Sequence, residues 1–228
     1  MSKLIKFTNI RGLNFNPPIS AMKSIPEWYK LMDEYIGGKK EAIDTSASAT
    51  IKKCMPVFDA MTAGYLLFTP VDVYVKQSED GPYYSWASQD VISFHPIEQA
   101  DKHPAKNNFP YPKWVNSYGV KTAPGYSTLF IQPMHHPNTI FTILPGVVDT
   151  DTYFAPVNFP FVLNDTSFEG LIPAGTPMAQ VIPFKRDSFK MEIGNEKDIK
   201  DIGNVVAQLA TKWFNKYKSM FWHRKEYK

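Results

Sequence analysis

The amino-acid sequence predicts a mainly β protein with a helix near its start and an amphipathic helix near its end. Between residues 114 and 184, turn signals recur roughly every dozen residues, which is typical of a compact antiparallel β domain. The chain of 228 residues contains 19 prolines and 14% aromatic residues, a composition that favours strands and turns. Residues 198–217 differ, because their apolar side chains repeat with the helical period.

An N-terminal extension with one or two helices is expected over residues 1–63. Ser24 suits the N-cap of the first helix, Pro26 suits its first turn, and Glu27 follows the cap by three residues. The apolar residues of this helix fall on one face: Trp28, Leu31, Met32 and Tyr35. A pair of glycines then ends the helix.

The β domain is expected over residues 64–190. Residues 64–75 have the composition of a strand that Pro70 interrupts. Residues 83–86 return as its partner strand after a turn. Several short strands, separated by turns that contain proline, glycine or asparagine, continue as far as Phe184.

An amphipathic helix and a basic, aromatic tail are expected over residues 191–228. One helical face collects the apolar residues Ile199, Ile202, Val206, Leu209, Ala210, Trp213, Phe214 and Tyr217. Such a stripe covers an apolar surface, so we expect the helix to pack on the β domain. The aromatic residues could instead dock a protein partner or stack on single-stranded nucleic acid. The candidate docking residues are Trp213, Phe214, Tyr217, Phe221 and Trp222.

The overall composition excludes several classes of protein. The net charge is +3 and charged residues make up 21% of the chain, so a concentrated basic stripe for nucleic acid is not expected. Cys54 is the single cysteine, which rules out an internal disulfide and is typical of a reducing compartment. We find neither a signal peptide nor an apolar run of ~18 residues that could span a membrane. A soluble intracellular protein is therefore expected.

Three motifs follow one another between residues 122 and 186. The first reads PGY at 124–126 and LFI at 129–131, the second GVVDTDTY at 146–153, and the third GTPMAQV at 175–181. Their order resembles the dUTPase and dCTP deaminase family, which has a β-clip fold. This resemblance implies a β-clip-like, dUTPase-like core. It also implies that Asp149 orients an attacking water and that Tyr153 packs on a nucleoside sugar.

The phosphate-binding positions of that family differ in this chain. PMHHP occupies residues 133–137, where the family has Arg and Ser, and Thr176 and Pro177 stand where the family has charged residues. No glycine-rich tail follows the third motif. A phosphate site needs converging N–H, hydroxyl or Arg donors. These departures favour a protein that lacks the catalytic activity of the family.

A second resemblance extends over the whole chain. The sequences IPEWYK at 25–30, CMP at 54–56 and VIPFKR at 181–186 resemble a family of uncharacterised proteins encoded by tailed phages and some bacteria. This resemblance implies a phage source and no particular activity.

The candidate catalytic residues are Asp149, Asp151 and Tyr153. The two acids are two positions apart, so on a strand both carboxylates face the same side. They could hold a divalent cation or a water, or they could belong to a solvated turn. The candidate binding residues are Tyr126, Gln132, His135 and His136, which we expect to share one pocket with the acids. His135 or His136 could meet His95 or Asp149 at a metal, but histidines beside a proline also suit a simple turn, and no metal site is assigned.

From these observations we expect a non-catalytic, phage-encoded binding or structural protein on a dUTPase-like β scaffold, either a virion component or an accessory protein. Self-association or a protein partner is expected, with no cofactor and no membrane. The place of action is the host cytoplasm, or the virion for a structural component. The alternative is a deoxynucleotide pyrophosphatase or deaminase of the dUTPase and dCTP deaminase type, which would use Mg²⁺ to bridge the phosphates.

Overall fold

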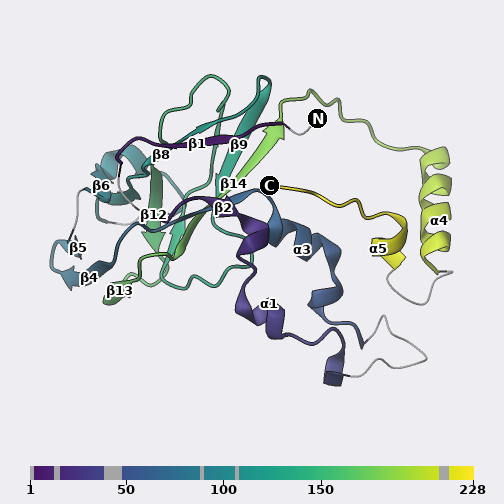
Figure 1. The fold of residues 1–228 in the computed structure, drawn as a ribbon, viewed down its shortest axis with the longest axis horizontal. Helices are drawn as coiled ribbons and strands as arrows, with labels where there is room; N and C mark the ends of the chain where they lie inside the picture. The colour runs from purple at the N-terminus through teal and green to yellow at the C-terminus, as the bar shows by residue number, and fades with distance from the viewer. Residues whose placement is uncertain (1–2, 13–15, 39–47, 88–89, 106–107, 211–215) are drawn as a thin grey trace.

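The computed structural model describes residues 3–12, 16–38, 48–87, 90–105, 108–210 and 216–228. Most of the strands gather in one body, and a long excursion after the last strand carries a helix away from it (Figure 1). All strand pairs among these residues are antiparallel. The mainly β fold expected from the sequence is confirmed.

The central sheet has five strands in the order β11-β9-β14-β3-β2. They are β2 (Ile19–Ser20), β3 (Tyr65–Phe68), β9 (Tyr126–Ile131), β11 (Gly146–Val148) and β14 (Pro177–Lys185). The middle strand β14 is buried continuously from Met178 to Val181. A strand that is covered on both faces has such an uninterrupted buried run.

Smaller sheets complete the body. One has the order β10-β12-β7-β6, with β6 (Ile92–His95), β7 (Tyr111–Trp114), β10 (Phe141–Ile143) and β12 (Phe159–Leu163). Another has the order β13-β4-β5, with β4 (Val73–Ser78), β5 (Gly81–Ser85) and β13 (Gly170–Ile172). A further pair joins β1 (Lys6–Asn9) to β8 (Tyr118–Lys121).

Aromatic side chains hold these sheets together. Phe161 of β12 stacks on Trp114 with ring centroids 5.0 Å apart and meets Phe141 at 5.4 Å and Tyr84 at 5.9 Å. Phe130 of the central sheet meets Phe159 at 5.6 Å. Aromatic pairs at these distances add to the stabilisation from burial. One continuous core therefore lies between the central sheet and the smaller sheets.

The N-terminal residues form several short helices: η1 (Ala21–Lys23), α1 (Glu27–Leu31), η2 (Ile36–Gly38), η3 (Ile51–Lys53) and α3 (Met55–Thr62). The expected cap of the first helix is wrong, because Pro26 occupies its N-cap position and Ser24 instead ends η1. The helix also ends before Tyr35, at Leu31, which is an exposed residue. Pro56 lies in the first turn of α3, where its missing N–H costs no helical hydrogen bond.

The C-terminal residues form α4 (Glu196–Ala210) and α5 (Lys216–Met220). The sequence predicted that the amphipathic helix packs on the β domain, and this prediction is wrong. Residues 187–195 run away from the body, and α4 stands off to one side (Figure 1). No described residue of α4 is buried. The hydrophobic stripe is real, but the described part of its own chain does not cover it.

Across the residues that the structure describes, no helix is both long enough and apolar enough to cross a membrane.

Candidate functional site

The turn that follows β11 carries the candidate catalytic acids. It is a turn and not a strand: the N–H groups of Thr152 and Tyr153 both donate to the carbonyl oxygen of Asp149, at 3.1 and 2.8 Å. Thr150 between the acids is buried. Its hydroxyl lies 2.8 Å from that of Thr122 and 2.7 Å from that of Thr128. This buried threonine triplet anchors the turn between the two acids, of which Asp149 has an exposed side chain and Asp151 a largely covered one.

Arg186, directly after β14, reaches both acids. Its Nη1 donates to Asp151 Oδ1 at 2.9 Å and to Asp149 Oδ1 at 3.2 Å, and its Nη2 donates to Asp151 Oδ2 at 2.5 Å. Gly125 N–H donates to Asp151 Oδ2 at 2.8 Å, and the hydroxyl of Ser127 donates to Asp149 Oδ1 at 2.6 Å. We call these three charged residues and Ser127 the arginine clasp. It ties the β11 turn to the end of β14.

The clasp changes the acid chemistry of Asp151. The hydrogen bonds from Arg186, followed by the one from Gly125 N–H, lower the pKa of Asp151 from 3.8 to about 2. The same pairing raises the pKa of Arg186 above its ordinary value. A carboxylate with so low a pKa is a weak base, because a general base works best with a pKa near the working pH. Asp151 therefore suits structural linkage better than proton abstraction.

Two candidate tyrosines lie near the clasp. Tyr126 begins β9, and its carbonyl oxygen accepts a hydrogen bond from Arg186 Nη1 at 3.1 Å. Tyr153 follows the acidic turn and keeps an exposed side chain. Among the residues described by the structure, no three His, Cys, Asp or Glu side chains gather in an arrangement that could hold a metal ion.

The other candidate binding residues lie in and beside a second turn, after β9. Gln132 accepts a hydrogen bond from Ile143 N–H at 2.9 Å through its Oε1. His135 adopts a left-handed conformation with φ of 61°, and its carbonyl oxygen accepts a hydrogen bond from Trp28 Nε1 at 2.9 Å. Burial, and secondly the neighbouring His135, lower the pKa of His136 to about 4. His136 is thus neutral near pH 7 and helps to form a packed turn.

The side chain of Gln180 holds this second turn against the central sheet. It is fully buried in β14, and its Oε1 accepts a hydrogen bond from Met134 N–H at 2.8 Å. Its Nε2 donates to the carbonyl oxygens of Ala60 and Ala63, at 2.9 and 2.7 Å. One amide thus joins the turn, the central sheet and α3. Buried polar groups satisfied in this way specify a unique packing.

The two turns lie at opposite ends of β9. The strand has six residues, which span about 17 to 20 Å at roughly 3.3 Å per residue. Tyr126, Asp149 and Asp151 meet at one end, whereas Gln132, His135 and His136 lie at or beyond the other. The structure therefore distributes the predicted pocket residues over two places.

The candidate docking residues differ in how exposed they are. Trp213 and Phe214 lie outside the described residues. Tyr217 is exposed, and Phe221 is half-buried.

Trp222 binds its own chain. Its Nε1 donates to Asp59 at 2.9 and 3.1 Å, beside a 2.6 Å ion pair between Lys225 Nζ and Asp59. The Tyr65 hydroxyl donates to the carbonyl oxygen of Lys228 at 3.2 Å. The tail is thus fastened to α3 and β3, a role that the sequence did not indicate.

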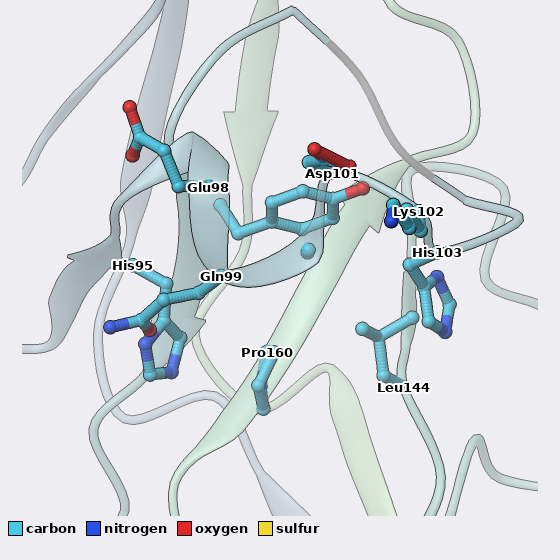
Figure 2. Close-up of a pocket in the computed structure, with 10 residues that line it drawn as sticks. His95, Glu98, Gln99, Asp101, Lys102, His103, Leu144 and Pro160 are labelled. Carbon is cyan, nitrogen blue, oxygen red and sulfur yellow. The ribbon is translucent and has the colours of Figure 1, made fainter.

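A cavity of about 680 Å³ lies beside the loop between β6 and β7. Figure 2 shows His95 and Gln99 close together at one side of it and His103 with Leu144 at the other. Its lining also includes Glu98, Asp101, Lys102, Tyr111 and Pro160. His103 Nδ1 accepts a hydrogen bond from Ala105 N–H at 3.0 Å, and the Tyr111 hydroxyl donates to Ala105 O at 2.6 Å. These two hydrogen bonds hold the loop in its conformation. The charged residues that line the cavity are of both signs, with Glu98 and Asp101 beside Lys102.

The sequence did not single out Arg186, Ser127, Gln180 or Asp59. Each acts through a partner at least 22 positions away in the chain. One signal was available for Arg186: a lone arginine ends the apolar β14 segment, and two closely spaced acids end the apolar β11 segment. Only the pairing of both strands with β9 shows that these ends meet.

No family model matches the chain, and no curated protein matches it. Among solved structures, a mutant dUTPase of Staphylococcus bacteriophage 80alpha with dUpNHpp matches 85% of this chain and 89% of its own, with 12% identity and a TM-score of 0.37. The native EIAV dUTPase matches 59% of this chain and 84% of its own, with 12% identity and a TM-score of 0.33.

A mutant dUTPase from phage phi11 of S. aureus also matches 59% of this chain and 84% of its own, with 14% identity and a TM-score of 0.32. All three structures are named as dUTPases, and the similarity of this chain to them is one of fold alone.

Proposed function

We propose that the protein is a non-catalytic binding or structural protein, a phage virion component or accessory protein, which acts by contact with other protein chains. The observation that carries this proposal is the arginine clasp. In the alternative, a nucleotide pyrophosphatase or deaminase, the acids must be available to a water or to Mg²⁺. Here Arg186 and Ser127 already bind them.

The accessible side chains also support the proposal. The excursion after β14 exposes Phe189, Met191 and Ile193, and α4 exposes Ile199 and Ile202. Contiguous exposed apolar surface on a folded protein marks a place for protein contact. The clasp and the exposed apolar residues support the same proposal. The two acids stabilise the fold through Arg186, and the apolar residues of the excursion remain accessible to another protein chain.

A turnover assay tests this proposal. The purified full chain is incubated with dUTP, dCTP and dTTP in the presence of Mg²⁺, and release of pyrophosphate and ammonia is measured beside an Asp149→Asn variant. We expect no release above the protein-free blank from either protein. Release by the wild type that disappears in Asp149→Asn would refute the proposal and establish the nucleotide enzyme.

A variant of Arg186 distinguishes a structural role of the two acids from a catalytic one. Arg186→Gln removes the charge that occupies the acids while keeping an amide donor. If the acids serve only the scaffold, this variant is less stable and still inactive toward all three nucleotides. Appearance of activity in Arg186→Gln would show that the clasp covers a working site.

A further inference from the structure

The apolar stripe of α4 is spaced as a helix-pairing seam. Ile199 and Val206 are seven residues apart, and Ile202 and Leu209 follow each of them by three. This is the a/d spacing of two heptads, with β-branched residues at both a positions. We call Ile199, Ile202, Val206 and Leu209 the α4 seam. Val205, exposed by 41%, flanks the seam at a g position and widens its apolar surface.

The seam has no cover within the described part of its own chain. Ile199, Ile202 and Val206 are exposed by 68%, 64% and 60%. The arm before the helix repeats the pattern in extended form, because Phe189, Met191 and Ile193 alternate along it and each is about nine-tenths exposed. The apolar surface therefore continues from the arm into the helix.

Local signals begin α4 but cannot hold it alone. Asn195 Oδ1 accepts a hydrogen bond from Lys197 N–H at 2.9 Å, and Asp198 Oδ2 accepts one from Asn195 N–H at 2.7 Å. This is the reciprocal pattern of a capping box. The helix has only 15 residues, a length at which isolated helices are marginal in water. Gly203 in its middle lowers the stability by about a further 1 kcal/mol relative to alanine. The helix thus needs a partner surface.

Both ends of the excursion are fastened to the body. At its start, Arg186 binds Asp149 and Asp151. At its end, Trp222 and Lys225 bind Asp59. The excursion is therefore a closed loop that presents α4 at its far side (Figure 1). Holding the helix by both ends reduces the conformational entropy that a partner would otherwise have to offset.

The chain exposes more surface than a compact monomer of the same mass. The chain exposes 14507 Å², whereas a compact monomer of 26.0 kDa exposes roughly 10,500 Å². The excess of about 4,000 Å² is several times the ~800 Å² that each partner contributes to a standard interface. The polar residues beside the seam carry both signs, with Lys197 and Lys200 among Glu196, Asp198 and Asp201. Two copies of the helix therefore do not repel each other strongly.

We propose that the α4 seam pairs with the α4 seam of a second copy of this chain, so that the protein self-associates through its excursion. The heptad spacing is what distinguishes this occupant from others, since a helix with an a/d seam is complementary to a copy of itself. A self-complementary patch gives a closed two-fold assembly. The inference rests on the proposed function, because it names the chain that the exposed surface contacts.

Sedimentation equilibrium of the full chain over a wide concentration range tests the pairing. The seam variant carries Ile202→Glu and Val206→Glu, and the matched control carries Asn204→Glu, which adds a carboxylate on the opposite side of the same helix. We expect dimers from the wild type and the control. In the seam variant the dissociation constant should rise more than ~100-fold, because each copy would bury two unpaired carboxylates.

Near-ultraviolet circular dichroism of all three proteins should be the same, since the substituted side chains are exposed in the single chain. A wild type that stays monomeric throughout overturns the pairing and leaves a different partner for the seam. An oligomer that survives in the seam variant also overturns it, because the contact then lies elsewhere. Neither result depends on nucleotide turnover, so failure of the pairing is distinct from failure of the proposed function.

Discussion

Arg186 and Asp151 form a two-pronged ion pair, with Nη1···Oδ1 at 2.9 Å and Nη2···Oδ2 at 2.5 Å. Bidentate pairs of this kind fix the orientation of both side chains. The pair joins the end of β14 to the turn after β11, and the excursion that carries α4 begins one residue later. The same contact therefore occupies one of the two candidate catalytic acids and fixes the base of the surface that we assign to recognition.

Asp151 should make the stability of the protein sensitive to acid. Its pKa is about 2 in the folded chain and 3.8 as an ordinary carboxyl. A lowered pKa contributes stability above the unfolded value and loses it as the pH falls through the folded value. The stability difference between wild type and Asp151→Asn should be constant above about pH 5 and shrink between about pH 4 and pH 2. Urea unfolding across this range measures it, and a difference that does not change with pH would contradict the pairing.

His136 should give a second, separate pH dependence. Burial lowers its pKa from 6.5 to about 4, so the unfolded chain binds a proton at pH values where the folded chain does not. The folded state then loses stability as the pH falls from about 6.5 toward 4. In His136→Phe this loss should be smaller than in the wild type. Thermal unfolding at pH 7 and pH 5 compares the two, with His223→Phe, at an exposed position, as the control.

Gln180 should be one of the most sensitive polar positions in the protein. Its three hydrogen bonds join Met134, Ala60 and Ala63. Gln180→Leu would leave these backbone groups without a partner, at about 1–3 kcal/mol for each buried group left unsatisfied. We expect a loss of about 3 kcal/mol or more in the free energy of unfolding. Gln132→Leu, which removes one bond to Ile143, should cost clearly less in the same denaturant titration.

Gly64 should not tolerate a side chain. Its φ is 69°, and a Cβ at this position would lie 2.0 Å from the carbonyl oxygen of Val181 in the central strand. That backbone oxygen cannot move without disturbing the sheet, so Gly64→Ala should lower the melting temperature strongly or prevent folding. Gly146→Ala is the control, because a Cβ there meets nothing within 4 Å. Equal melting temperatures for the two variants would contradict the close approach of Gly64 to the backbone of β14.

The sequence predicted the parts of the fold that depend on local patterns. Pro70 does separate two strands, β3 and β4, and the heptad residues of α4 do form a helix. The position of α4 could not be predicted, because an amphipathic stripe requires a cover but does not say which molecule supplies it. The first helix was misjudged at Ser24, since a serine suits the end of a 3₁₀ turn as well as an α-helical cap.

The candidate site was predictable only in part. The spacing of Asp149 and Asp151 did indicate that both carboxylates share one side, although a turn and not a strand places them there. Their partner Arg186 belongs to another strand, and the long-range pairing of strands is not encoded in either segment alone. The same reason hid the separation of His135 from Asp149, because their motifs are neighbours in the sequence and lie near opposite ends of β9.

Hydrogen–deuterium exchange of the full chain at low and high protein concentration tests most directly the claim that α4 acts by protein contact. Amide exchange reports the free energy of local opening, and an unsupported 15-residue helix opens easily. We expect amides of α4 to become protected as the concentration rises, while those of the buried strand β14 stay equally protected. Rapid exchange in α4 at both concentrations would contradict the account.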